Sequence, residues 1–205
     1  MGMINKLKIT LRLGGQKLKI NLKKNKAFTL IEVIVVIAVI GIVLPVLFSI
    51  IFSILQQQTK IQRLSLVKKE GDYILNVIEN TLRNYAVKIY SENSFTTERC
   101  TTDNPTYGPS NGINFFFRDK YDRWFNFYQN SNNISSNSAN LSSPVDLNSS
   151  QTKITNFSIQ CYKTALYSPP VVNVSFTIEY NTTSSRTEEK VTPLTYQTKI
   201  KLKSY

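Results

Sequence analysis

The residue that most clearly points to a chemical role in this sequence is Glu32, a single carboxylate inside an apolar run. From Phe28 to Leu55 no other residue carries a charge. A lone acid in a membrane-length segment costs about 2.5–3.5 kcal/mol on insertion scales, and such residues usually mark function. The alternative is that the side chain only extends to the nearby interface, because Lys26 is a few residues away.

The rest of the sequence offers few groups for catalysis. It contains no histidine, which excludes Ser-His-Asp and Cys-His arrangements and disfavours the common zinc and haem sites. No glycine-rich phosphate loop is present. Asp103, Asp119 and Asp122 are scattered acids, whereas calcium takes roughly six to eight oxygen ligands. We therefore expect no enzyme activity, no metal and no cofactor, with calcium at these three acids as an alternative.

Positive charge is concentrated at the N-terminus. Residues 1–27 carry eight of the 25 lysines and arginines and no acid, so they supply most of the net charge of +12. A basic segment before an apolar span is typical of a cytoplasmic anchor rather than of a nucleic-acid footprint. Nucleic acid is therefore not the expected partner.

The apolar run 28–55 is long enough to cross a hydrocarbon core of about 30 Å as a helix. Because its basic side is N-terminal, the N-terminus should stay in the cytoplasm and the remainder should be exported. The run is too long for an ordinary secretory signal, and no Ala-x-Ala sequence follows Leu55. The span is therefore expected to remain in the mature protein.

The residues around Glu32 form a specific motif. The sequence Lys-Ala-Phe-Thr-Leu-Ile-Glu at 26–32 resembles the type III signal of bacterial type IV pilins and type II secretion pseudopilins. The resemblance implies that a prepilin peptidase cuts between Ala27 and Phe28 and methylates the new amine of Phe28. Glu32 then becomes the fifth mature residue. Most members have glycine where this chain has Ala27.

The resemblance also implies a role for Glu32 in assembly. Cleavage creates a positive amine on Phe28, and a buried Glu32 can meet the amine of a neighbouring subunit. A buried charge is costly unless it is paired, so the acid would favour docking in the correct register. The implied partners are other pilin or pseudopilin subunits, the prepilin peptidase and the inner-membrane assembly platform.

Beyond Leu55 the pattern becomes amphipathic. Apolar residues recur every three or four positions from Ile61 to Ile89, which is typical of one helical face. We expect one helix from about Thr29 to Tyr90, with its amphipathic half at 56–90. Gly41 and Pro45 loosen its apolar half, as an ordinary transmembrane kink or as a place that melts in a filament.

The sequence after the predicted helix begins as turns. Residues 91–112 are rich in turn chemistry, after which 113–118 and 124–129 read as a hairpin. The tract 130–152 is rich in serine and asparagine and predicts a long loop.

Alternating strands complete the chain at 154–163, 172–180 and 194–202, with a loose connection at 181–185. A long helix followed only by strands predicts an α+β fold, with 91–205 forming a globular antiparallel β domain. The resemblance to pilins implies that the sheet packs on the outer half of the helix.

Cys100 and Cys161 both lie on the side expected to be exported. Two cysteines in an oxidising compartment favour a disulfide, which would close a loop of about 60 residues. The alternative is that Cys161 is a buried free thiol on an alternating strand.

The resemblance implies a non-enzymatic minor pilin or pseudopilin. The stretch at 69–84 is similar to J-type minor pseudopilins and the related large minor pilins. Such a subunit would sit in the bacterial inner membrane and then enter a periplasmic or cell-surface filament. Two alternatives stay open: an unprocessed single-span binding protein, and a DNA-uptake pseudopilin. For the latter, the aromatic residues of the hairpin at 115–128 would stack on single-stranded DNA rather than form core.

Overall fold

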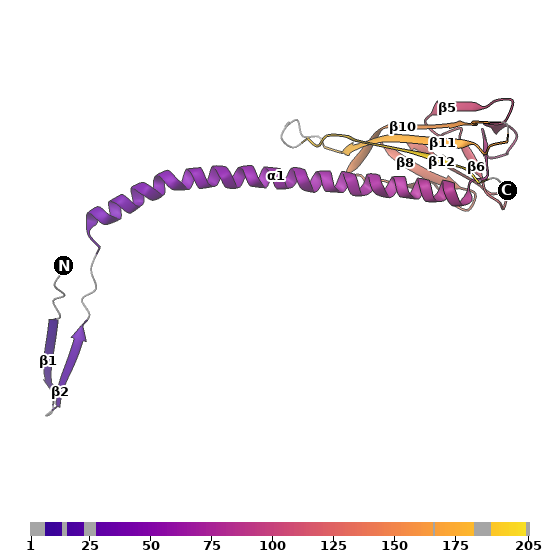
Figure 1. Ribbon diagram of the computed structural model, residues 1–205. Helices are drawn as coiled ribbons and strands as arrows, with labels where there is room; N and C mark the ends of the chain where they lie inside the picture. Colours follow the sequence, from indigo (N-terminus) through magenta and orange to yellow (C-terminus); the bar gives the residue numbers. More distant parts are fainter. Residues whose placement is uncertain (1–6, 14–15, 23–27, 166, 183–189, 204–205) are drawn as a thin grey trace. The chain divides into compact units, whose positions relative to one another are not determined.

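The computed structural model describes residues 7–13, 16–22, 28–165, 167–182 and 190–203. The chain divides into two compact units, Met1–Ser53 and Ile54–Tyr205. One helix, α1 (Leu30–Tyr85), crosses the boundary between them (Figure 1). The α+β class expected from the sequence is confirmed, with the helix packed against antiparallel sheets.

The first unit contains an antiparallel pair of strands that the sequence analysis did not predict. Strands β1 (Leu7–Leu13) and β2 (Gln16–Leu22) pair along their whole length, with Leu7 opposite Leu22. Both segments alternate apolar and polar residues with a period of two, which suits extended backbone. The same segment is strongly basic, which is why the sequence predicts a leader there rather than strands.

The second half of α1 buries one stripe of side chains. Val67, Gly71, Ile74, Ile78 and Leu82 are buried at the predicted spacing of three and four. The predicted start of the stripe is wrong, because Ile61 and Leu64 remain exposed.

The predicted end of the helix at Tyr90 is also wrong, because α1 stops at Tyr85 and β3 (Lys88–Tyr90) follows. Ile89 lies four residues after Tyr85, so its spacing is compatible with a continued helix as well as with a strand. Strand pairing decides the matter: Ile89 pairs with Phe117 on one side and Arg99 on the other.

A six-stranded antiparallel sheet has the order β4-β3-β6-β7-β8-β9. The predicted hairpin is confirmed, with Phe117 opposite Phe125, but its first strand begins at Phe116 and not at Ile113. The tract 130–152 is not simply the predicted loop, because β8 and β9 lie within it. The strands of this sheet after β3 are β4 (Glu98–Arg99), β6 (Phe116–Arg118), β7 (Trp124–Asn130), β8 (Asn133–Ser138) and β9 (Val145–Asp146).

Polar side chains hold the strands of this tract together. The buried Ser135 donates its hydroxyl hydrogen bond to Asp146 at 2.5 Å, and the Ile134 amide donates to the Asn148 side chain at 3.0 Å. Because hydrogen bonds replace apolar alternation here, a hydrophobic pattern could not reveal these strands.

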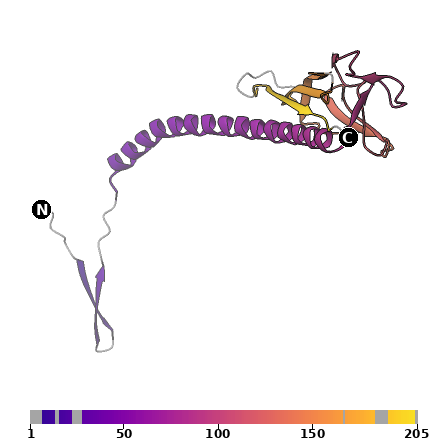
Figure 2. The same cartoon turned by 45° about the vertical axis from the view of Figure 1, so that its right-hand side comes forward.

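A four-stranded antiparallel sheet has the order β12-β11-β10-β5. Its yellow edge strand, β12, runs beside the second half of α1 (Figure 2). Its three long strands confirm the predicted ones, while β5 falls in a segment predicted to be irregular. The predicted connection at 181–185 lies partly outside the described residues. The strands are β5 (Thr106–Ser110), β10 (Thr152–Tyr162), β11 (Val171–Tyr180) and β12 (Leu194–Lys201).

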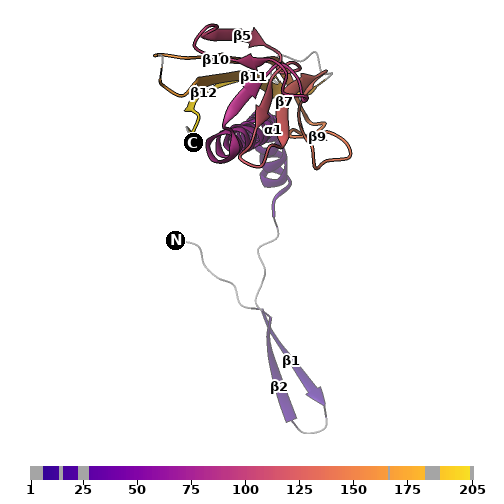
Figure 3. The same ribbon diagram turned by 90° about the vertical axis from the view of Figure 1, so that its right-hand side faces the viewer.

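One core joins the second half of α1 to both sheets (Figure 3). Ile74 and Ile78 of the helix meet Phe117 and Phe127 of the six-stranded sheet and Phe176 of the four-stranded sheet in a single buried cluster. The amphipathic half of the helix is therefore the common support of the two sheets.

Candidate functional site: the start of the apolar helix

The first turn of α1 is closed by a reciprocal pair, Thr29 and Glu32. The Thr29 amide and hydroxyl both donate to Glu32 Oε2, at 2.8 and 3.0 Å. The Glu32 amide lies 3.4 Å from Thr29 Oγ1 and donates to it. This is a capping box, in which Thr29 precedes the helix and the acid three residues on reaches back.

The sequence analysis missed this local role of Glu32. The signal was present, because Thr-x-x-Glu before an apolar run is typical of a helix start. An acid in the first turn is also favoured by the helix dipole. Glu32 therefore has a structural partner within its own chain, although the motif around it suggests a partner in another subunit.

The helix beyond Glu32 presents a continuous apolar surface. Every residue from Leu30 to Leu55 is exposed, and the acid is the only charged one among them. By length and composition α1 contains a segment able to cross a membrane, although a signal sequence near the N-terminus passes the same test. Of the two residues at the predicted cleavage point, Phe28 is 80% exposed, and Ala27 lies outside the described residues.

A second contact region fixes α1 to the four-stranded sheet. Gly71 is buried, and a Cβ at this position would overlap the ring of Tyr196. The Tyr196 hydroxyl donates to the Lys68 carbonyl oxygen at 3.2 Å, and its ring stacks on Phe176 with centroids 5.2 Å apart. Burial, together with the nearby Asp72 carboxylate, raises the pKa of Tyr196 to about 12.

The tract 130–152 is tied to the helix by one acid. Glu70 Oε2 accepts a hydrogen bond from the Ser149 amide at 3.2 Å and another from the Thr152 hydroxyl. Neither this contact nor that of Gly71 was predicted. A glycine in the middle of an amphipathic stripe was the available signal.

The structure pairs Cys100 with Cys161, the first of the two arrangements considered. Both residues are buried, and their Cα atoms are 6.1 Å apart. Cys100 follows β4 of one sheet and Cys161 lies in β10 of the other. The disulfide is therefore a covalent link between the two sheets.

The three acids considered for calcium do not form a site together. Asp119 is buried and accepts hydrogen bonds from the Tyr121 and Arg123 amides and from the Arg123 guanidinium, while Asp122 pairs with Arg118. Burial alone would raise the pKa of Asp119, but these hydrogen bonds outweigh it and hold that pKa below its usual range. Within the described ranges no group of three candidate ligands could hold a metal ion.

The aromatic side chains considered for DNA stacking are largely core. Phe115, Phe117 and Phe127 are at most 1% exposed, and the rings of Phe117 and Phe125 stack on each other within the sheet. Since a base can only stack on an open ring face, this hairpin does not offer the row of exposed rings that the alternative requires.

Comparison with known proteins identifies the N-terminal segment. Residues 22–44 match the family model described as the prokaryotic N-terminal methylation motif. No curated protein and no solved structure is significantly similar to the chain. The chain thus carries the signal of type IV pilins and pseudopilins, which indicates membrane anchoring and a pilin-like structural subunit.

Proposed function

We propose that this chain is a minor pilin or pseudopilin, a non-enzymatic subunit of a type IV pilus or type II secretion pseudopilus. A prepilin peptidase cuts between Ala27 and Phe28 and methylates the Phe28 amine. Before assembly the subunit is anchored in the inner membrane, with its N-terminus cytoplasmic and its globular domain exported. It then joins other pilin subunits through the apolar half of α1.

The observation that carries the proposal is the state of the Glu32 carboxylate. Both hydrogen bonds to this carboxylate are accepted by Oε2 and come from Thr29. Among the described residues Oε1 accepts no hydrogen bond, so one carboxylate oxygen is left for a further partner. In a packed bundle of apolar helices that charge requires a cation, and the Phe28 amine of a neighbouring subunit supplies one.

A pair of variants separates the charge of Glu32 from its capping. Glu32→Gln removes the charge and retains a side chain that completes a capping box. Thr29→Val removes the capping hydroxyl and retains the charge. Loss of a threonine cap costs about 0.5–2 kcal/mol of helix stability, which a helix of 56 residues tolerates.

The assay is co-isolation of each variant with the partner pilins, together with mass spectrometry of the mature N-terminus. We expect N-methylated Phe28 in both variants, normal incorporation of Thr29→Val and poor incorporation of Glu32→Gln. Normal incorporation of Glu32→Gln would show that the acid serves only as a cap. An uncut N-terminus in the wild-type protein would instead support the unprocessed membrane-anchored protein.

A further inference from the structure

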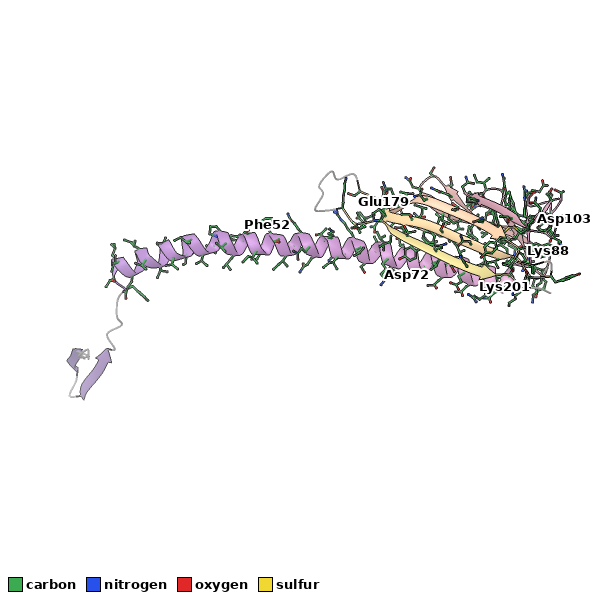
Figure 4. The ribbon with its side chains drawn as sticks, turned by 45° about the horizontal axis from the view of Figure 1, so that its top comes forward. Phe52, Asp72, Lys88, Asp103, Glu179 and Lys201 are labelled. Carbon is green, nitrogen blue, oxygen red and sulfur yellow. A yellow bond between two sulfur atoms is a disulfide. The ribbon has the colours of Figure 1, made fainter. Side chains whose placement is uncertain are left out.

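A basic cavity lies at the end of the globular unit near the C-terminal end of α1, where Figure 4 labels Lys88. Its volume is about 350 Å³, which is in the range of small-ligand sites. Four cationic side chains and one acid line it: Lys88, Arg99, Lys163, Lys203 and Glu98. Nothing in the proposed assembly of the N-terminal helix uses this cavity.

Most of the positive charge in the cavity is uncompensated. Glu98 is bound to Lys88, with Oε2 and Nζ 2.9 Å apart, and this hydrogen bond raises the pKa of Lys88. Among the described residues, Arg99, Lys163 and Lys203 have no carboxylate partner. Three cations that line one cavity give it a positive potential, which favours an anionic ligand.

Arg99 is positioned by strand pairing and by a ring contact, and no carboxylate in the described part of the chain pairs with it. It belongs to β4, where it pairs with Ile89, and its guanidinium lies 3.9 Å from the centroid of the Tyr107 ring. Its Nε atom is buried and has no hydrogen-bond partner in the described part of the chain. Arg99 as a whole is only partly buried, so the rest of its guanidinium can contribute charge to the cavity that it lines.

The backbone next to the two lysines is also anchored. The Lys163 amide donates to the Pro105 carbonyl at 2.8 Å. Its Nζ donates to the neutral Thr102 Oγ1 at 3.4 Å, its one hydrogen-bond partner among the described residues. Lys203 follows Leu202, whose amide donates to the Pro170 carbonyl at 3.0 Å.

The disulfide joins the two segments that supply the cations. Arg99 directly precedes Cys100, and Lys163 follows Cys161 by two residues. The covalent link between the sheets thus keeps an arginine of one sheet and a lysine beside the other at the same cavity. Such fixed positions reduce the ordering cost of binding.

We propose that this cavity binds a phosphate monoester, with Arg99, Lys163 and Lys203 as the binding residues. A phosphate monoester carries a charge of about −1.5 to −2 at pH 7, which suits three unpaired cations better than a single carboxylate does. A nucleic-acid phosphodiester carries one charge per residue along an extended backbone. It suits a basic groove rather than a cavity.

The experiment is calorimetric titration of the full chain in a nonionic detergent with inorganic phosphate and, separately, inorganic sulfate, chloride keeping the ionic strength constant. We expect saturable binding at one site. Arg99→Gln and Lys163→Gln should each weaken it about tenfold or more, because each removes a charge-assisted contact. The control is Lys199→Gln, an exposed lysine of β12 that does not line the cavity.

Each variant is first shown to be folded by its melting temperature and by the fluorescence of Trp124, the single tryptophan. Non-saturable binding, or an equal loss in all three variants, would mean a general charge effect and would overturn the proposal. A single-stranded oligonucleotide with a 5′ hydroxyl provides the last arm. If it binds through Arg99 and Lys163 more tightly than phosphate does, the site is a nucleic-acid interface and the proposed ligand is wrong.

Discussion

Removing the covalent link between the two sheets should lower the stability of the globular unit by several kcal/mol. The perturbation is reduction of the Cys100–Cys161 disulfide, compared with the double variant Cys100→Ala, Cys161→Ala. Reduction breaks the cross-link and keeps both sulfur atoms, whereas the double variant also removes buried atoms from the core. The difference in unfolding free energy between the reduced protein and the double variant therefore measures the contribution of side-chain packing, separately from that of the cross-link.

The size of the effect follows from the sequence separation of 61 residues. In the chain-entropy model, closing a loop of this length stabilises the folded state by about 4 kcal/mol at 25 °C, with measured values commonly about 2–4. For a unit of about 150 residues, each kcal/mol changes the melting temperature by about 2–4 °C. Reduction should therefore lower the melting temperature by about 10 °C.

The assay is urea unfolding followed by the fluorescence of Trp124, because this single tryptophan lies in β7 of the globular unit and not in the apolar helix. Thiol counting must show no free cysteine in the native protein and two after reduction. The unfolded state of the oxidised chain is more compact, so its denaturant dependence should be shallower. Equal stability of oxidised and fully reduced protein would refute the reasoning.

Three further predictions concern the helix joint, the acid limb and processing. Gly71→Ala should destabilise the globular unit by about 1–3 kcal/mol in urea unfolding, since the added Cβ would overlap Tyr196. Gly41→Ala is the control, because no atom lies within 4 Å of a Cβ at that position. Equal effects of the two variants would contradict the contact between Gly71 and Tyr196. Because the folded-state pKa of Asp119 is lowered, its stabilisation is present above about pH 4 and is lost as the pH falls below that value. Asp119→Asn should thus flatten the acid limb of the Trp124 fluorescence titration, and an unchanged limb would exclude this role. Ala27→Leu should block removal of the 27 leader residues and Ala27→Gly should retain it, so equal processing on a blot would remove the peptidase from the proposal.

Several features were readable from the sequence because they depend on neighbouring residues. The apolar run after Phe28, in which Glu32 is the single charged residue, follows from composition. The motif around Glu32 follows from the order of neighbouring residues. The buried stripe from Val67 to Leu82 and the alternation of β11 express the periods of helix and strand. The capping box of Thr29 and Glu32 is equally local and could have been read as well.

Only the tertiary structure decided where residues far apart in the chain meet. The end of α1 at Tyr85 depends on pairing of β3 with β6, about 28 residues later. The strands within 130–152 depend on hydrogen bonds such as that of Ser135 with Asp146, which no hydrophobic period records. The basic cavity likewise exists only because Arg99 and Lys163, 64 positions apart in the sequence, are brought together beside one disulfide. Local periodicity describes which face of an element is apolar, whereas the partner of that face is chosen by packing over the whole domain.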